Sequence, residues 1–491
     1  MSRVEISSTV NKVGESVKLA GWVHNRRDHG KLIFIDLRDR SGVIQMVFTP
    51  KNGSATSGQG PQDDIYEMAS KLRPEWVVEV IGKIAQRPEK MFNLEIATGQ
   101  IELQPENLEV LAEAVTPPFA LDTDGKEIGE ENRMQYRYLD LRRARLRDNL
   151  TLRHRVIKFI RDYLDKQGFL EIETPILTKS TPEGARDYVV PSRLYASKFF
   201  ALPQSPQQYK QLLMVAGIEK YFQIARCFRD EDTRGDRQPE FTQLDLEMSF
   251  VEREDVIALN EALLIELVKT VVPEKRIQTI PFPRLTYKEA MEKYGTDRPD
   301  LRENKDDPNL LAFCWVIDFP FFEKTDPSAG SQPSQGFGGQ AGHGGWTFTH
   351  NPFSAPKPEF YDHLIKQENV GEILTSQYDV IMNGFELGGG SIRNHRAEAL
   401  EAVFKVMGFS AERIQKNFGH MLEAFSFGAP PHGGIAWGMD RLVMLLANEA
   451  NIREVIAFPK TGDARDPMMQ SPSELEVKQL NELHIQLKAG K

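Results

Sequence analysis

The sequence predicts an α+β protein in which a small N-terminal β-barrel precedes a larger domain built on an antiparallel sheet. Residues 17–112 contain short β-rich runs with one helix-like stretch among them. From residue 136 onward, strand-like runs mix with helices, without the regular βαβ alternation of a parallel sheet. Between these regions the hydrophobic pattern lapses and prolines and acidic residues gather. We therefore expect a barrel at 1–112, a hinge at 113–135 and a second domain at 136–491.

The N-terminal region is expected to hold five strands, with a helix between the third and the fourth. The strand-like runs are VKLAGWVHN, KLIFIDLRD, GVIQMVFT, WVVEVIGKIA and GQIELQPENLEVL, and the helix-like run is DDIYEMASKL. This order fits an OB-fold, a barrel whose face often binds oligonucleotides. Any other small β-barrel would show a similar pattern, and that alternative stays open.

The second domain is expected to begin with an amphipathic helix. Apolar residues recur at helical spacing in LTLRHRVIKFIRDYLDKQG, and Gly168 supplies a C-terminal stop. The apolar face consists of Leu152, Val156, Ile157, Ile160 and Leu164. The strand-like runs that follow are FLEIETPIL, FFALPQ, YFQIARCFRD, EFTQLDLEMSF, CWVIDFPFF, YDVIM, FELGG and GIAWGM, with helix-like EDVIALNEALLIELVKTVV among them.

Composition excludes several classes of protein. With 491 residues, 40% hydrophobic and 27% charged, the chain has the make-up of a folded protein of several domains. A net charge of −10 argues against a protein that coats nucleic acid, so any RNA contact would be local. The two cysteines, Cys227 and Cys314, cannot build a disulfide framework, and no apolar run has the length of a signal peptide or a membrane span. We expect a cytoplasmic protein that binds neither membrane nor DNA.

Residues 326–345, DPSAGSQPSQGFGGQAGHGG, form a low-complexity stretch that is expected to be a mobile loop. The GFGGQA within it is only loosely similar to a dinucleotide-binding fingerprint, because no strand precedes it and no helix follows. The chain also lacks a GxxxxGK(S/T) phosphate-binding loop. Nucleotide binding would therefore need another arrangement of residues.

The segment CFRDEDTRGDRQPEFTQLDLEMSF is the richest in candidate functional residues. It reads as two strands that flank a charged loop, and side chains alternate between the faces of a strand. One face of the first strand would carry Arg229 and Glu231. The corresponding face of the second strand would carry Phe241, Gln243, Asp245 and Glu247. A guanidinium binds phosphate through forked donors and an aromatic ring stacks on a purine, so nucleotide binding on a sheet is one interpretation. A solvated polar face is the other.

A metal site is predicted in YDVIMNGFELGGG. The pair Asn383 and Gly384 is a strong signal for a two-residue hairpin. The resulting register sets Ile381 opposite Glu386 and puts Asp379 on the same face as Glu386. Two carboxylates on one face repel each other unless a cation lies between them, and Mg²⁺ prefers such oxygen ligands. The three glycines that follow would let a ligand approach the backbone. Two solvated acids on an open face are the alternative.

Three spaced segments and several local signatures resemble a known family. FRDE with EFTQLDLE is similar to motif 2 of class II aminoacyl-tRNA synthetases, GFLEIETPIL with Pro175 is similar to motif 1, and GIAWGMDRL is similar to motif 3. TPEGARDY, LPQSPQQYKQLLM and FELGGGSIR resemble signatures of the bacterial aspartyl-tRNA synthetases, and the likeness runs over nearly the whole chain. It implies an OB-fold anticodon domain, a class II antiparallel-sheet catalytic domain, and a homodimer with motif 1 at the subunit interface.

The resemblance also implies a reaction. Such enzymes activate L-aspartate with ATP and Mg²⁺, by in-line attack on the α-phosphorus, and then transfer the aspartyl group to tRNA(Asp). The implied catalytic residues are Arg229, Glu386 and Arg441, and the implied metal ligands are Asp379 and Glu386. ATP binding is implied for Arg229, Asp230, Glu231, Gln238, Phe241, Glu386, Gly438, Asp440 and Arg441. Aspartate binding is implied for Glu183, Ser205, Gln207, Lys210, Arg229, Asp245, His350 and Arg393. Among these, Lys210 and Arg393 would distinguish the β-carboxylate from the amide of asparagine.

Contacts with both ends of the tRNA are implied as well. The implied anticodon contacts are Arg26, Arg27, His29, Phe34, Gln45 and Gly82, and the implied acceptor-end contacts are Arg234, Asp236 and Arg237. His29 and Gly82 look like the relaxed subfamily, which also aspartylates tRNA(Asn). We therefore expect dual specificity, with a strictly tRNA(Asp)-specific enzyme as the alternative.

Two features depart from the bacterial pattern. Bacterial relatives usually insert a whole domain between motifs 2 and 3, whereas TDRPDLRENKDDPNLLAFCWVIDF passes directly from one core element to the next, so we expect the insertion to be absent. The run THNPF has Asn351 where many relatives have a second histidine, which puts the role of that position in doubt. The rival interpretations are an asparaginyl or lysyl synthetase, a catalytically inactive RNA-binding paralogue, and a tRNA-independent enzyme that adenylates aspartate.

Overall fold

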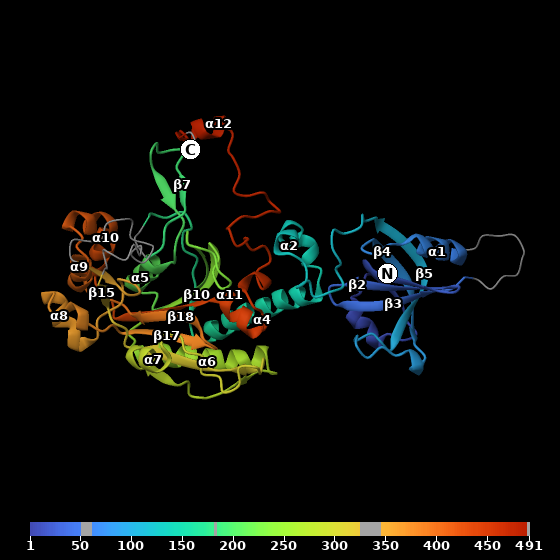
Figure 1. Cartoon of the computed structure of the whole chain (residues 1–491), viewed down its shortest axis with the longest axis horizontal. Coiled ribbons are helices and arrows are strands. Elements are labelled where there is room, and N and C mark those ends of the chain that lie inside the picture. Colours follow the sequence, from blue (N-terminus) through green and yellow to red (C-terminus); the bar gives the residue numbers. More distant parts are fainter. Residues whose placement is uncertain (51–60, 181–183, 325–344, 489–491) are drawn as a thin grey trace, which may run out of the picture. The chain divides into compact units, whose positions relative to one another are not determined.

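The computed structural model contains two compact units (Figure 1). It describes residues 1–50, 61–180, 184–324 and 345–488. The first unit comprises Met1–Gly129 with Tyr138–Arg147, and the second comprises Glu130–Arg137 with Asp148–Lys491. Glu183 and all but the last residue of the predicted 326–345 loop lie outside the described residues. The domain boundaries expected at 112 and 135 stay predictions.

The first unit is built on a closed five-stranded barrel. Its elements are β1 (Ser16–His29), β2 (Leu32–Asp39), β3 (Gly42–Phe48), α1 (Pro61–Lys71), β4 (Val77–Gln86) and β5 (Ile101–Ala112). The strand order β1-β2-β3-β5-β4, with α1 between β3 and β4, confirms the predicted OB-fold. Alternate side chains point inward, so Leu19, Ile35 and Val80 are fully buried while their neighbours on each strand reach the outer surface.

The second unit is built on an eight-stranded sheet of the order β12-β14-β17-β18-β19-β10-β9-β6. The strands are β6 (Leu170–Glu171), β9 (Lys220–Phe228), β10 (Glu240–Ser249), β12 (Arg284–Thr286), β14 (Phe313–Ile317), β17 (Gln377–Met382), β18 (Phe385–Ile392) and β19 (His432–Gly438). The pairs between β14 and β9 are antiparallel, as predicted, and both edge pairs are parallel. Only two residues of the predicted FLEIETPIL strand, Leu170 and Glu171, pair with β9, and the N–H of Ile172 donates to the backbone oxygen of Phe222.

Helices lie before, between and after these strands along the chain (Figure 1). They are α2 (Glu130–Gln135), α3 (Arg137–Asp140), α4 (Ala144–Lys166), α5 (Gln207–Val215), α6 (Arg253–Val271), α7 (Tyr287–Tyr294), α8 (Tyr361–Lys366), α9 (Ala397–Val406), α10 (Ala411–Ser426), α11 (Met439–Leu446) and α12 (Val477–Glu482). The predicted amphipathic helix is the later part of α4, where Val156, Ile160 and Leu164 are fully buried. These residues join a core with α6, α11 and the sheet residues Leu244 and Leu246, which leaves the alternate positions of β10 for the other face.

Short elements complete the described part of the chain. The small sheets pair β7 (Val189–Pro191) with β8 (Phe199–Ala201), β11 (Arg276–Ile277) with β13 (Leu310–Leu311), and β15 (Phe322–Lys324) with β16 (Trp346–Phe348). Turns of 3-10 helix occur at Ile6–Asn11, Glu89–Met91, Pro358–Phe360, Val370–Glu372 and Ile452–Glu454. None of the described helices combines the length and the apolar character needed to cross a lipid bilayer.

Candidate active site

The polar face of the sheet begins at the hairpin of β9 and β10. Because side chains alternate along β10, Leu244 and Leu246 enter the core and Asp245 and Glu247 lie on the opposite face. Phe241 is four residues before Asp245, toward the loop and on that same face, and the Arg229 guanidinium lies 5.1 Å from the centre of its ring. This arrangement puts a cation and an aromatic ring together at the mouth of the hairpin, as the sequence predicts.

A cavity of about 550 Å³ opens over this face. It is lined by β10, β18, α5 and the loop between β9 and β10. The predicted site residues that it gathers are Ser205, Gln207, Lys210, Arg229, Glu231, Arg234, Arg237, Asp245, His350, Asp379, Glu386 and Arg393. Residues that come from six separate stretches of sequence therefore share one pocket, which we call the main cavity.

Two buried cations and two buried carboxylates form one end of the main cavity. The ammonium of Lys210 lies 2.5 Å from Asp245 Oδ1 and 3.5 Å from Glu247 Oε2. The guanidinium of Arg393 donates to Glu247 at 2.9 and 3.1 Å and to Ser391 Oγ at 2.9 Å. All four charged side chains are at most 3% exposed. The opposite charges balance here, which is what lets ionised groups stay buried without ligand.

The two carboxylates of this cluster respond differently to their surroundings. Burial raises the pKa of Asp245, although Lys210 opposes the shift. Burial acts in the same direction on Glu247, but Arg393 and Lys210 overcome it and hold the pKa of that carboxyl below its usual value. Asp245 Oδ2 is buried and has no hydrogen-bond partner among the described residues. An acceptor in that position suits a donor supplied by a ligand, because an unpaired buried polar atom is costly.

The hairpin of β17 and β18 turns at Asn383 and Gly384, as predicted. Both residues have positive φ angles, 53° and 83°, which is the conformation that a two-residue type I′ turn requires. Ile381 pairs with Glu386 as expected, and a bulge between Val380 and Ile381 then shifts the register by one residue. Beyond the bulge, the residue opposite Asp379 is Gly389.

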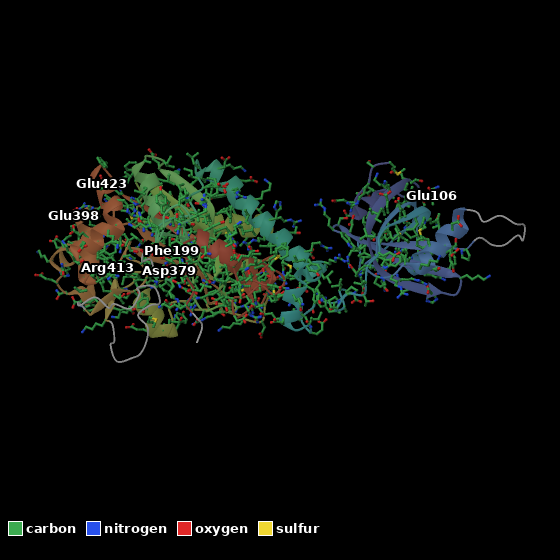
Figure 2. The ribbon with its side chains drawn as sticks, turned by 90° about the horizontal axis from the view of Figure 1, so that it is seen from above. Glu106, Phe199, Asp379, Glu398, Arg413 and Glu423 are labelled. Atoms are coloured by element: carbon green, nitrogen blue, oxygen red, sulfur yellow. The ribbon has the colours of Figure 1, made fainter. Side chains whose placement is uncertain are left out.

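Asp379 and Glu386 meet over Gly389. A Cβ atom on Gly389 would lie 2.7 Å from Asp379 Oδ1 and 3.7 Å from Glu386 Oε1, so any larger residue would fill the space between the carboxylates. Asp379 is 4% exposed and lies well inside the second unit (Figure 2). Burial and the neighbouring Glu386 raise the pKa of Asp379 well above its usual value. Two acids in this position fit a divalent cation, which would relieve their repulsion.

A smaller cavity of about 240 Å³ adjoins the main cavity and shares Arg229, Glu231, Arg237 and Glu386 with it. Its other predicted site residues are Asp236, Gln238, Phe241, Gly438, Asp440 and Arg441. Arg441 donates to the backbone oxygen of Glu386 and, at 3.1 Å, to Asp236 Oδ2, while its Nε is buried without a partner in the described chain. Gln238 Nε2 is likewise buried and unpaired within that part of the chain. These free donors point to an anionic or carbonyl-bearing ligand.

Two predicted ATP contacts have other partners. Asp440 accepts from Arg153 at 2.5 Å and from the backbone N–H of Thr242 at 2.9 Å, so both of its oxygens are used to fix the start of α11. Asp230 lines neither cavity and lies 3.5 Å from Arg186. Asp440 nonetheless lines the smaller cavity beside Arg441, and the roles of Asp440 and Asp230 in ATP binding stay predictions.

The histidine in THNPF and its neighbour Asn351 both line the main cavity but make different contacts. His350 lines the main cavity and packs edge-on against Phe319, with ring centres 4.6 Å apart. Burial lowers the pKa of His350, and the acids Glu386 and Asp297 act against that shift. Asn351 Oδ1 accepts from the backbone N–H of Phe353 at 3.0 Å, so this side chain stabilises the turn.

On the barrel, the predicted anticodon contacts Arg27, Phe34 and Gln45 share one outer face. Arg27 is opposite Phe34, and Asp36 is opposite Gln45, so period-two alternation aligns all four side chains. The Arg27 guanidinium donates to Asp36 at 2.9 Å and to Gln45 Oε1 at 3.3 Å. His29 packs edge-on against Phe34 at 6.4 Å. We call these residues the barrel face.

Two predicted anticodon contacts are not part of the barrel face. Arg26 alternates to the other side of β1, where it binds Asp28 and the backbone oxygen of Ser70. Gly82 pairs with Val17, at the opposite end of β1 from His29. A Cβ atom on Gly82 would lie 2.4 Å from the backbone oxygen of Gln104, so close strand packing already explains this glycine.

Two further residues, Arg87 and Glu102, adjoin the barrel face, and the sequence did not indicate either of them. Gln45 Nε2 lies 3.5 Å from a Glu102 carboxylate oxygen. Arg87 is 6% exposed, and its Nη2 has no partner among the described residues. Burial lowers the pKa of Arg87, while Glu102 and Asp36 act against that shift. No local sequence pattern marks these residues, because Arg87 lies just after β4 and reaches the face only through barrel closure.

Known proteins match both parts of the chain. The family described as tRNA synthetases class II (D, K and N) matches residues 129–462, and the OB-fold nucleic acid binding domain matches residues 17–111. A solved structure of asparaginyl-tRNA synthetase from Pyrococcus horikoshii, complexed with asparaginyl-adenylate, superposes with a TM-score of 0.71. It is 24% identical and covers 94% of this chain and 98% of its own. This likeness concerns the fold.

Curated relatives are closer in sequence. The aspartate–tRNA(Asp/Asn) ligase of Rubrobacter xylanophilus is 41% identical over 600 aligned positions, covering 97% of this chain and 95% of the relative. The aspartate–tRNA ligase of Staphylococcus carnosus is 39% identical over 605 positions, covering 98% of each chain. Both alignments exceed the 491-residue chain, so over a hundred positions of these relatives have no counterpart here. The chain belongs to the class II aminoacyl-tRNA synthetases, and within them to the aspartate–tRNA ligase family.

Proposed function

We propose that this protein activates L-aspartate with ATP and transfers the aspartyl group to the 3′ end of tRNA(Asp) and of tRNA(Asn). One observation carries the proposal. Two buried cations, Lys210 and Arg393, line the same cavity as Arg229 and the acid pair of Asp379 and Glu386. A dicarboxylate amino acid and a polyphosphate bound to magnesium are the ligands that such a set of charges fits.

Arginines and one aromatic ring would hold the nucleotide. Arg229 lines both cavities and would bind the α-phosphate, where negative charge builds up during attack by the aspartate carboxylate. Phe241, next to Arg229, would stack on the adenine. Arg441, whose buried Nε has no partner within the described ranges, would bind the far end of the triphosphate. No proton transfer is needed in this step, so catalysis consists of positioning the reactants and neutralising their charge.

Lys210 and Arg393 would discriminate aspartate from asparagine. A β-carboxylate accepts hydrogen bonds from both cations, whereas the amide of asparagine would turn an NH₂ group toward at least one of them. That mismatch sets an N–H donor of the amide against a buried N–H donor of the protein, which gives stronger discrimination than a difference in size alone. Ser205, Gln207 and Asp245 would receive the α-ammonium group, and His350 and Glu183 complete the proposed aspartate site.

Asp379 and Glu386 would hold Mg²⁺, and the space above Gly389 fits a cation between them. A divalent cation held by these two carboxylates would supply positive charge that offsets the charge of the ATP phosphates. Gln377 Nε2 donates to Asp379 Oδ1 at 3.2 Å and keeps that carboxylate oriented without metal. In the loop between β9 and β10, Arg234, Asp236 and Arg237 line the cavities and would meet the acceptor end of the tRNA.

A homodimer is part of the proposal. Ile176 and Leu177 follow Pro175 and are 40% and 53% exposed, and Phe199 on the adjacent β8 is 54% exposed (Figure 2). Leu177 and Phe199 line one hollow, so the exposed apolar surface is contiguous. A surface of this kind supports contact with a second copy of the chain. A cytoplasmic location, expected for the family, belongs to the proposal too.

We also propose that the insertion domain of the longer relatives is absent from this chain. The relatives' extra length supports it, and so does the direct path of this chain from α7 to β14. β12 and β14 pair side by side in the sheet, with Arg284 opposite Trp315. A short connection therefore replaces whatever the longer relatives carry between these elements.

Purified protein is expected to catalyse ATP–pyrophosphate exchange with L-aspartate and not with L-asparagine, and to aspartylate transcripts of both tRNA(Asp) and tRNA(Asn). The exchange reaction tests amino-acid activation, and the two transcripts test the tRNA range separately. Exchange with asparagine alone would favour the asparaginyl alternative. Aspartylation of tRNA(Asp) but not of tRNA(Asn) would support the aspartate–tRNA ligase activity and contradict the dual specificity.

Replacing Phe34 by alanine is expected to lower aspartylation of tRNA(Asp) by about 10-fold to 100-fold, since stacking of one base on an aromatic ring contributes about 1–3 kcal/mol. Exchange without tRNA should not change, because Phe34 is in the first unit and lines neither cavity. Steady-state kinetics of both reactions would measure the two effects. Equal loss in both would contradict the anticodon role.

A further inference from the structure

A chain of buried hydrogen bonds runs from the backbone to the predicted substrate contact Gln207. Nδ1 of His432 lies 2.7 Å from the backbone oxygen of Pro430. Nε2 of the same ring lies 3.1 Å from Gln211 Nε2, and Gln207 Nε2 lies 3.0 Å from Gln211 Oε1. Gln211 and His432 are fully buried, and only Gln207 reaches the main cavity. We call the hydrogen-bonded residues Gln207, Gln211 and His432 the glutamine relay.

The relay fixes the direction of every hydrogen bond in it. The oxygen of Pro430 can only accept, so His432 Nδ1 carries the proton and donates. The Nε2 atom of a neutral ring can then only accept, so Gln211 turns its NH₂ group toward the ring and its oxygen toward Gln207. Gln207 must therefore donate from its own NH₂ group to Gln211 Oε1. Because the NH₂ group of Gln207 is turned toward Gln211, its carbonyl oxygen points away from Gln211 and is the acceptor that this side chain can offer to a ligand.

The surroundings of His432 keep the ring neutral. Glu247 on β10 favours the charged form, whereas Arg393 and His395 after β18 oppose it. Burial outweighs all of these and lowers the pKa of His432 to about 4. The relay therefore keeps one direction at neutral pH. A charged ring would donate from both nitrogens and would require Gln211 to turn round.

We propose that Gln211 and His432 are positioning residues that select the α-ammonium group of the amino acid, by holding the Gln207 carbonyl oxygen toward the main cavity. The inference rests on the proposed function and names the groups behind one of its specificity contacts. An oxygen accepts from an ammonium group, whereas a reversed amide would oppose it with an NH₂ group. The relay therefore helps the site to discriminate L-aspartate from succinate, which has the same two carboxylates but no amine.

The test is the variant Gln211→Met, which keeps the length of the side chain and removes both polar atoms. Released from its partner, the Gln207 amide is free to turn. The KM for L-aspartate in ATP–pyrophosphate exchange is expected to rise about tenfold, because a hydrogen bond to a charged group is lost. The inhibition constant of succinate is expected to stay within about twofold of the wild-type value, because succinate makes no contact that depends on the relay. General damage to the site would weaken both ligands together.

Gln208→Met is the matched control. Gln208 is the neighbour of Gln207 on α5, is similarly buried, and also binds a histidine, with His420 Nε2 at 2.8 Å from its Oε1. It lines a different hollow and has no role in the relay. His432→Phe removes the acceptor at the other end of the relay and is expected to change the ratio of the two constants in the same direction as Gln211→Met.

The outcomes separate the inference from the proposed function. Wild-type protein without aspartate-dependent exchange would defeat the proposed function itself. With active wild type, an unchanged ratio in the folded Gln211→Met or His432→Phe variant would overturn the relay. An equal change in Gln208→Met would overturn it as well, because any buried glutamine of α5 would then have the same effect. A changed ratio in both relay variants, with Gln208→Met at the wild-type value, would support it.

Discussion

Replacing Arg229 by alanine is expected to reduce aspartate-dependent ATP–pyrophosphate exchange by a factor on the order of 10³ or more, since one positioned donor to a developing charge contributes about 10² to 10³ and an arginine on a transferring phosphate more. Arg229 lines both the main cavity and the smaller one, and its guanidinium lies against the proposed adenine-stacking ring of Phe241. Loss of the guanidinium removes the proposed phosphate contact and also the cation–π contact with the ring of Phe241. Exchange kinetics with saturating ATP would measure the effect on kcat.

Arg226→Ala is the matched control for this variant. Arg226 is on the same strand, β9, but it pairs with Glu240 at 2.6 Å and lines neither cavity. Its replacement is expected to leave exchange within about twofold of wild type, as for most exposed ion pairs. Binding of tRNA by Arg229→Ala should remain, because the barrel face is intact. Near-normal exchange in Arg229→Ala would contradict the proposed phosphate contact.

Period-two alternation explains why so much of the main cavity could be predicted. Along β10 the core residue Leu244 and the site residue Asp245 are neighbours, so the pattern of the strand alone separates the two faces. The Asn383 and Gly384 turn fixed the start of the register of β17 and β18 in the same way. The bulge beyond it was not predictable from local sequence, and it is the bulge that sets Gly389 opposite Asp379.

Contacts between distant parts of the chain add partners that the sequence does not indicate. Asp440 is predicted from GIAWGMDRL to bind nucleotide, and its carboxylate also accepts a hydrogen bond from Arg153, which lies far earlier in the sequence. Gly82 looks like a specificity position, yet the backbone of Gln104 on the next strand requires a glycine there. Glu247 appears in the alternating pattern of β10, but only the fold reveals that it orients Arg393. In each case the neighbouring group comes from a distant part of the sequence, so no local pattern identifies it.

Replacing Asp379 by asparagine is expected to change activity and stability in opposite directions. Exchange should fall by about 10²-fold, and the Mg²⁺ concentration for half-maximal exchange should rise, because one of the two proposed ligands loses its charge. The protein without metal should melt slightly higher, since the variant removes a buried repulsion and about 1 kcal/mol corresponds to roughly 1–2 °C in a unit of more than 300 residues. Metal-dependent exchange and thermal melts without Mg²⁺ would measure the two effects.

The sign of the stability change follows from the pKa of Asp379. Burial and Glu386 raise that pKa above its ordinary value of 3.8, so the folded chain holds the proton more tightly than the unfolded chain does. The resulting loss of stability begins as the pH rises through 3.8 and is complete above the raised pKa, which is why asparagine is stabilising at neutral pH. Asp318→Asn is the control of opposite sign, because Asp318 binds Arg253 at 2.7 Å and Lys357 at 3.3 Å, and its loss should lower the melting temperature. If Asp379→Asn also melted lower and kept the metal dependence of the wild type, Asp379 would be a structural acid and the magnesium site would lie elsewhere.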